Sequence, residues 1–248
     1  MPDERQGGFH AAQNMLITLG KYRLNCFLPE RKEGQQEVSQ AVYLHTAAGE
    51  AESVWELTDR SFALVVVEGI DWNRDLSPWR HEKVFAGGED FAGGAAEYLT
   101  TLTEQLIPAT EQALKLRPER RYLAGYSLGA LFAVYAIYHT SLFDGIGSIS
   151  GSLWYDGFLR YVEEHTVKRN PEKIYFSLGK KEASSARGIM QTVLVRTKQI
   201  EEKFRNDGID TMMEMNEGNH FTQAPERIAK GIRWLLRSPE RTEGKEFE

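Results

Sequence analysis

Short apolar segments without polar alternation recur along the chain, at intervals that are too long for hairpins. Strands covered on both faces have this character, as in a parallel sheet. We therefore predict buried strands at residues 41–45, 62–67, 122–125, 145–149 and 174–178, with 211–215 as a weaker candidate for the last strand. Residues 22–28 differ, because their apolar side chains alternate with Arg23 and Asn25. That period predicts a half-buried outer strand.

Helical patterns separate these strands. Residues 94–116 place apolar side chains on one face, and Pro108 inside the pattern predicts a kink or a restart. Residues 128–138 are small and apolar, which predicts a buried helix, and residues 189–206 and 225–237 are amphipathic. Strands that alternate with helices predict an α/β fold with a mostly parallel central sheet and right-handed crossovers.

Composition limits the function classes. The 248 residues contain no linker rich in Pro, Gly or Ser, so we expect one domain over 1–248 with a polar tail from about residue 238. A net charge of −6 argues against broad binding to the phosphate backbone of nucleic acids. No apolar run approaches the ~18 residues of a membrane span, the first residues lack a signal-peptide core, and Cys26 alone cannot form a disulfide framework. We expect a cytoplasmic protein without nucleic-acid or membrane partners.

The segment Gly125-Tyr126-Ser127-Leu128-Gly129 carries the strongest chemical signal. It follows a predicted buried strand and opens a predicted helix, which is the context that a G-x-S-x-G nucleophile elbow requires. A serine on such a turn lies at a helix N-terminus, where unpaired amides favour developing negative charge. We predict that Ser127 is a nucleophile and that the Leu128 N–H is one oxyanion-hole donor.

His220 is the candidate base. Chains with this elbow place the serine first, the acid second and the histidine last. The other histidines precede Ser127 or lie in helical segments: His10, His45, His81, His139 and His165. His220 lies in a loop-forming sequence between the last predicted strand and the last helix, with Gly218 and Asn219 just before it. Such a loop presents a side chain at the carboxyl end of a strand.

A base of this kind needs an acid that orients it. Glu182 is the nearest carboxylate in the loop after the strand at 174–178, and Asp156 follows the strand at 145–149. Either loop can supply the acid. We favour Glu182 and keep two alternatives, Asp156 and a histidine without an acid partner.

The second oxyanion donor is expected in the small loop after the strand that ends at His45. The candidates are the backbone amides of Thr46 and Ala47, between which the sequence does not choose. The chain has neither an H-E-x-x-H segment nor paired Cys-x-x-Cys motifs, so we predict no metal site. The chemistry of an activated serine needs no organic cofactor.

Taken together, several segments resemble the putative-esterase branch of the α/β-hydrolase superfamily, which includes esterase D and the enterochelin-type siderophore esterases. The resemblance covers roughly residues 20–236. Its matching segments are 74–79, 91–99, 125–129, 150–156 and 218–221. It implies an α/β-hydrolase fold without a large cap domain. It also implies that Ser127 is the nucleophile, His220 the base and Glu182 the acid.

The resemblance further implies a substrate cleft lined by Arg74, Ser152 and Trp154. From the residues alone, Arg74 can equally form a surface ion pair with Asp75, and Trp154 can serve in packing. The expected function is hydrolysis of carboxylic esters through an acyl-enzyme on Ser127, with siderophore-type or small acyl esters as substrates. Two alternatives remain: acyl transfer to an alcohol or sugar by the same residues, and a catalytically inactive hydrolase fold that binds a ligand. A homo-oligomer is compatible with the sequence.

Overall fold

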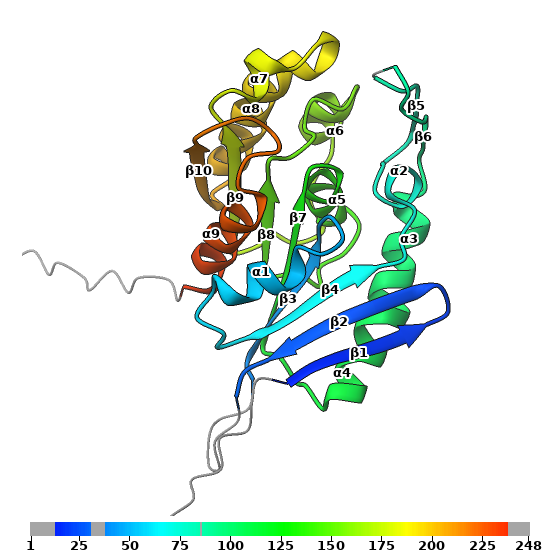
Figure 1. Cartoon of the computed structure of the whole chain (residues 1–248). Coiled ribbons are helices and arrows are strands. Elements are labelled where there is room, and N and C mark those ends of the chain that lie inside the picture. Colours follow the sequence, from blue (N-terminus) through cyan, green and yellow to red (C-terminus); the bar gives the residue numbers. More distant parts are fainter. Residues whose placement is uncertain (1–12, 31–37, 85, 238–248) are drawn as a thin grey trace, which may run out of the picture.

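The computed structural model describes residues 13–30, 38–84 and 86–237. Over these residues, eight strands form one sheet in the order β1-β2-β4-β3-β7-β8-β9-β10 (Figure 1). The strands are β1 Gln13–Leu19, β2 Tyr22–Leu28, β3 Gln40–His45, β4 Ala63–Glu68, β7 Arg120–Tyr126, β8 Gly145–Ile149, β9 Lys173–Gly179 and β10 Asp210–Asn216. Strands β4, β3, β7, β8, β9 and β10 run parallel to their neighbours, whereas β1–β2 and β2–β4 are antiparallel pairs. The predicted mostly parallel sheet is confirmed.

Helices cover both faces of this sheet. They are α1 Ala51–Glu56, α2 Trp72–Asp75, α3 Ala95–Thr101, α4 Ile107–Leu114, α5 Leu128–Ala136, α6 Phe158–Glu164, α7 Glu182–Ser185, α8 Val193–Asn206 and α9 Ala224–Leu236. Side chains of α1 and α9 join one buried cluster, and side chains of α3, α4, α5, α6 and α8 join the other. A short hairpin, β5 Arg80–His81 with β6 Phe91–Ala92, lies beside α2 (Figure 1). The described residues form no helix that is long and apolar enough to cross a membrane.

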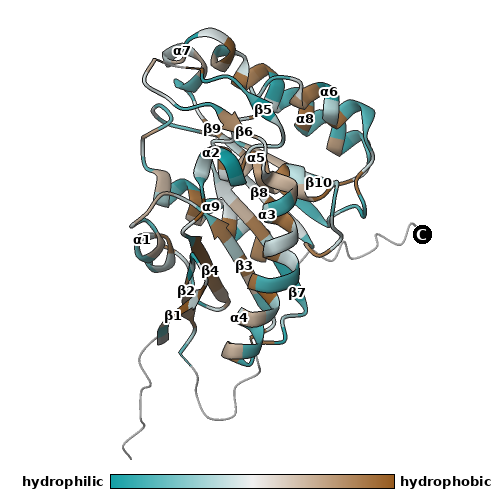
Figure 2. Ribbon diagram, turned by 90° about the vertical axis from the view of Figure 1, so that its right-hand side faces the viewer, coloured by the Kyte–Doolittle hydropathy of each residue, from teal (hydrophilic) through white to brown (hydrophobic). Residues whose placement is uncertain are grey.

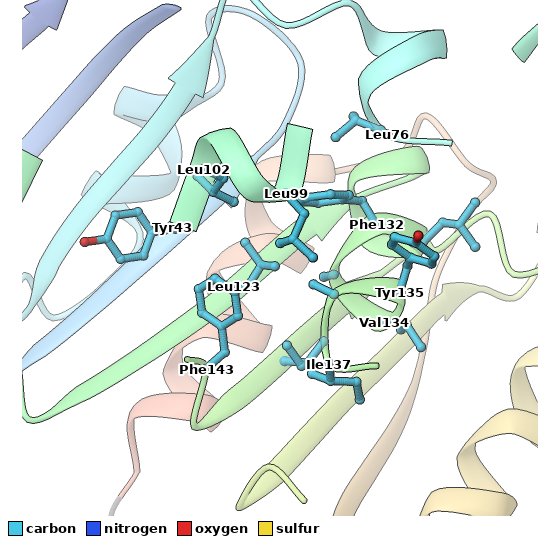
Figure 3. Close-up of a cluster of buried hydrophobic side chains, with 14 of the residues drawn as sticks. Tyr43, Leu76, Leu99, Leu102, Leu123, Phe132, Val134, Tyr135, Ile137 and Phe143 are labelled. Atoms are coloured by element: carbon cyan, nitrogen blue, oxygen red, sulfur yellow. The ribbon is translucent and has the colours of Figure 1, made fainter. Parts of the chain in front are cut away.

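The strands supply side chains to both buried clusters. On β7, Leu123 packs with Phe132 and Phe143 on the α5 face (Figure 3), while Tyr122 and Ala124 pack on the α9 face. The middle strands are accordingly apolar along most of their length, and polar residues concentrate on the outer sides of the helices (Figure 2). This two-sided burial is why the sequence of these strands does not alternate.

The prediction of residues 22–28 as an outer strand is wrong in one respect. The strand forms as β2, but it lies between β1 and β4, and β1 forms the edge of the sheet. Apolar residues alternate along β1 at Met15, Ile17 and Leu19, and the side chains of Ile17 and Leu19 pack against the core, while Leu16 on the other face is 60% exposed. Sequence reasoning missed this alternation, which is the pattern of a strand with one face covered.

Pro108 interrupts the helical pattern as predicted. The helix continues from α3 through a π-helical turn, Leu102–Leu106, and α4 then begins at Ile107 with Pro108 in its first turn. Pro108 has no N–H to continue the backbone ladder, and the helix accommodates it through the π-helical turn just before it, in which the Ile107 amide donates to the Leu102 carbonyl. The predicted polar tail from about 238 lies outside the described residues.

Candidate active site

Ser127 lies on a sharp turn between β7 and α5. Its φ of 58° and ψ of −118° fall in a region that side-chain-bearing residues rarely adopt, at a cost of about 1–3 kcal/mol. Two glycines allow the strand and the helix to approach this closely. A Cβ on Gly125 would lie 2.2 Å from the carbonyl carbon of Gly129, and a Cβ on Gly129 would lie 2.7 Å from the carbonyl oxygen of His45. The strained turn projects the serine from the start of α5.

Three side chains from distant parts of the chain form a hydrogen-bonded series. The Nε2 atom of His220 lies 3.1 Å from the Ser127 hydroxyl oxygen, and its Nδ1 atom lies 3.0 Å from Oε2 of Glu182. An ionised carboxylate can only accept hydrogen bonds, so Nδ1 carries the proton. Nε2 of the neutral ring is then free to accept the proton of Ser127. This geometry suits general-base activation of the serine.

Glu182 is held firmly at the start of α7, with its side chain 4% exposed. Its second carboxylate oxygen, Oε1, accepts hydrogen bonds from the Gly179 amide at 2.6 Å and from the Ser150 hydroxyl at 2.8 Å. Burial alone would raise the pKa of Glu182, but the hydrogen bonds from His220, Gly179 and Ser150 outweigh it and hold the pKa below its usual value. The carboxylate therefore stays ionised next to His220.

Asp156, the alternative acid, occupies a different place. It is exposed, and its backbone carbonyl accepts a hydrogen bond from the Trp79 indole at 3.0 Å. Within the described part of the chain, the carboxylate that contacts His220 is that of Glu182. The assignment of Glu182 as the acid stays a prediction, and the geometry favours it over Asp156.

The candidate oxyanion donors lie beside Ser127. Leu128 begins α5, and its amide has no hydrogen-bond acceptor among the described residues. The carbonyl of His45 packs directly against Gly129, so the loop that follows β3 runs alongside the elbow. Thr46 is buried there and donates its hydroxyl to the Glu50 carboxylate. The Leu128 amide is thus placed to bind an oxyanion, and the amides of Thr46 and Ala47 both remain candidates for the second donor.

The predicted cleft residues have different surroundings. The hydroxyl oxygen of Ser152 lies 3.3 Å from that of Ser127, and the Ser152 amide donates to the Ser127 carbonyl at 3.0 Å. Trp154 is 9% exposed and packs against Phe91. The structure therefore brings Ser152 to the nucleophile, whereas Trp154 serves mainly in packing near it.

Arg74 is engaged in two ion pairs. Its guanidinium contacts the buried carboxylate of Asp75 at 2.8 Å and the exposed carboxylate of Glu97. Lys21 adds a second cation to Asp75 at 3.1 Å. The ion pair with Asp75 that the sequence suggested therefore forms. Within the described residues no hydrogen bond joins Arg74 to Ser127 or His220, and its role in binding substrate stays a prediction.

Sequence reasoning missed three residues around Glu182 and His220. The Tyr126 hydroxyl donates to the backbone carbonyl of His220 at 2.6 Å, Ser150 donates to Glu182, and the Arg227 guanidinium donates to the Oε1 atom of Glu182 at 3.0 Å. Arg227 had a visible signal, because it lies one residue before Ile228 on the apolar face of an amphipathic helix. A charge in that position is seldom buried without a partner.

The described residues contain no group of three or more His, Cys, Asp or Glu side chains that could hold an ion. His45, whose backbone packs against Gly129 of the elbow, is fully buried, which lowers its pKa to about 3. Its Nε2 atom pairs with the Tyr98 hydroxyl at 2.6 Å. It is a neutral core residue beneath Gly129.

The sheet order, the position of the elbow after β7 and the histidine loop after β10 define the chain as an α/β-hydrolase. Comparison with protein families narrows this class. The model of the family described as "Putative esterase" matches residues 18–224, and the chain belongs to that family. This confirms the resemblance inferred from the sequence and assigns the chain to the ester hydrolases.

Individual relatives agree with this fold. The chain is 26% identical to the uncharacterized protein YbbA of Bacillus subtilis over 232 residues. The aligned region covers 87% of this chain and 93% of YbbA. The siderophore hydrolase EstA of Aspergillus nidulans superposes with a TM-score of 0.68 at 19% identity, over 95% of this chain and 97% of EstA. An IroE-like serine hydrolase from Shewanella oneidensis superposes with a TM-score of 0.72 at 20% identity, over 90% of this chain and 79% of the hydrolase.

Proposed function

We propose that the protein is a serine esterase that hydrolyses carboxylic esters through an acyl-enzyme on Ser127. One observation carries the proposal: the hydrogen-bonded series from Glu182 through His220 to a serine held at a positive φ on the elbow. Membership of the esterase family supports the reaction class. The series supplies the nucleophile, the base and the orienting acid that ester cleavage without a cofactor requires.

The reaction has two steps. His220 accepts the hydroxyl proton as Ser127 attacks the ester carbonyl, and the amides of Leu128 and of Thr46 or Ala47 stabilise the resulting oxyanion. The protonated histidine then gives its proton to the leaving alcohol, which leaves an acyl group on the serine. Water, activated by His220, releases the acid and restores the enzyme. Glu182 stabilises the imidazolium in both steps.

For the substrate, we propose siderophore-type or small acyl esters. The siderophore hydrolase EstA and the IroE-like hydrolase share this fold, which makes such esters the first compounds to test. The cytoplasmic location stays a prediction from the sequence.

The test is intact-mass labelling with a fluorophosphonate. We expect one adduct per chain, mapped to Ser127, and its loss or strong slowing in Ser127→Ala and His220→Ala. The exposed His165 provides a matched control, because it contacts Tyr161 and not the elbow; His165→Ala should label at the wild-type rate. A folded wild-type protein that forms no adduct would exclude the serine mechanism and favour the inactive, ligand-binding fold.

A second measurement separates hydrolysis from acyl transfer. A panel of aryl acyl esters and siderophore esters is incubated with and without an excess of an acceptor alcohol, and the products are identified by mass. Free acid in both conditions supports the esterase proposal. An acyl-alcohol product that dominates even at low acceptor concentration would instead show a transferase.

A further inference from the structure

Arg227 is a fully buried arginine on α9, with its side chain 1% exposed. One guanidinium nitrogen, Nη1, donates to Oε1 of Glu182 at 3.0 Å and to the Ser150 hydroxyl at 3.0 Å. The other, Nη2, donates to the backbone carbonyls of Glu217 at 2.7 Å and Asn219 at 2.9 Å. A single side chain therefore connects the acid to the loop that carries His220.

The surroundings are shaped to admit this guanidinium. A Cβ on Gly179 would lie 2.8 Å from Nη2 and 3.1 Å from Nη1 of Arg227, so the absence of a side chain at residue 179 leaves room for the guanidinium in this position. Burying a guanidinium is unfavourable unless it is well paired, and an apolar residue of similar size is often as stable in such a place. Stability alone therefore gives a weak reason for an arginine here.

We propose that Arg227 is a positioning residue for the catalytic series, an inference that rests on the proposed function. Arg227 donates to Oε1 of Glu182 together with the Gly179 amide and the Ser150 hydroxyl. Oε2 of the same carboxylate then accepts the hydrogen bond from Nδ1–H of His220. At the same time Arg227 holds the carbonyls on either side of Gly218, just before the histidine. Glu182 and the loop that carries His220 are therefore hydrogen-bonded to the same planar guanidinium, which fixes the distance between the acid and the base.

The positive charge has a second consequence. The Arg227 guanidinium lies 3.0 Å from Oε1 of the Glu182 carboxylate, so it offsets part of the negative charge that faces His220. The other titratable groups near the pair are the Tyr126 phenol on β7, whose pKa is raised by burial, and the exposed Lys180–Glu217 ion pair. The phenol is neutral and the ion pair is balanced, so Arg227 is the cation that offsets Glu182.

The test compares three variants of the whole protein. Arg227→Gln removes the charge, Arg227→Lys keeps the charge but loses the planar fork, and Arg233→Gln is the control on the same helix. Arg233 is exposed and donates to the Leu57 carbonyl, away from the elbow. The measurement is the rate of fluorophosphonate labelling of Ser127 between pH 5 and 9, with circular dichroism and thermal melting to show that each variant is folded.

Arg227→Gln should label at least tenfold more slowly at neutral pH. The acid limb of its pH–rate profile should move upward by about half a pH unit to one unit, which is less than a charge in direct contact with His220 would cause. Arg227→Lys should be slowed several-fold with the acid limb unmoved. Arg233→Gln should match the wild type. If Arg227→Gln does not fold, the labelling rate of folded Arg227→Lys decides: a several-fold slower rate that cooling does not restore supports the inference, and the wild-type rate overturns it.

Two results would overturn the inference. Folded Arg227 variants with the rate and acid limb of the wild type would show that the arginine is only a packing residue. An equal loss of rate at every pH in both variants, recovered on cooling, would point to global destabilisation. In either case normal labelling of the wild type leaves the proposed function intact. An unlabelled wild type would remove the proposed function, and this inference with it.

Discussion

Replacing Glu182 by glutamine tests the catalytic series most directly. The substitution preserves the shape of the side chain but exchanges one carboxylate oxygen for an amide nitrogen that can only donate. Three donors surround the Oε1 position: the Gly179 amide, the Ser150 hydroxyl and the Arg227 guanidinium. They force the amide oxygen of the glutamine into that position, so its NH₂ group must point at His220.

The consequence is a change of tautomer. The Nδ1 atom of His220 would then have to accept a hydrogen bond, which moves the ring proton to Nε2, the atom that faces the Ser127 hydroxyl at 3.1 Å. A ring protonated there cannot take the serine proton. Loss of the correct tautomer lowers kcat about 10⁴-fold in the serine-protease triad, and we expect a loss of about 10³–10⁴-fold here, equal to about 4–5.5 kcal/mol of activation free energy.

The assay is kcat/KM for an activated aryl ester, together with the labelling rate of Ser127. Asp156→Asn is the matched control, because Asp156 is exposed and the hydrogen bond recorded for it is made by its backbone carbonyl to Trp79. This substitution should change the rate by less than about threefold, as expected for a surface position. Glu182→Gln leaves Arg227 buried without a counter-charge, at a cost of about 3 kcal/mol of stability. Rates are therefore compared where both variants are shown to be folded. A Glu182→Gln enzyme within tenfold of the wild type, or an equal loss in Asp156→Asn, would refute the reasoning.

Three further predictions concern stability and the elbow. Gly129→Ala places a Cβ 2.7 Å from the His45 carbonyl and should destabilise the protein by about 1–3 kcal/mol in urea unfolding while slowing labelling of the serine; an unchanged labelling rate would contradict the close approach. Phe132→Ala, at a fully buried site, should cost about 3–5 kcal/mol, whereas Phe221→Ala, at a residue 89% exposed, should cost less than about 0.5 kcal/mol. Because the pKa of Glu182 is lowered on folding, its ionised carboxylate stabilises the protein at pH values above the unfolded value near 4.5, and the difference in melting temperature from Glu182→Gln should shrink as the pH falls through the folded pKa; a difference that grows as the pH falls below about 4.5 would contradict the lowered pKa.

The parts of the fold that carry strong local patterns were predictable. Buried parallel strands require continuous apolar residues, and the predicted segment at 145–149 coincides with β8. The elbow is visible because its turn demands glycines at fixed spacing. The edge strand β1 was missed although its apolar residues alternate, because Leu16 blurs the pattern: Ile17 and Leu19 pack on the core, whereas Leu16 points to the other face and is 60% exposed. Short helices such as α7, at Glu182–Ser185, are also too brief to show a period.

The candidate site divides in the same way. Ser127 and His220 could be chosen because chain order and loop composition restrict them, whereas the sequence favoured Glu182 as the acid without excluding Asp156. Both follow strands of the same sheet edge, and which carboxylate reaches the histidine depends on the path of each loop. That path is set by tertiary contacts: the Trp79 indole holds the backbone at Asp156 outward, and the Gly179 amide holds the Glu182 side chain inward.

Arg227 shows where sequence reasoning on catalysis reaches its limit and how it can be extended. A motif search examines the groups that react, and an arginine on a C-terminal helix is not among them. Yet Ser127, Ser150, Glu182 and His220 lie on four different segments, and proton transfer requires their mutual distances to be held to within a fraction of an ångström. Loops alone cannot provide that rigidity, since their ends move independently. A charge on the apolar stripe of the helix beneath them is therefore the feature to look for, because only a site with several fixed acceptors can satisfy it there.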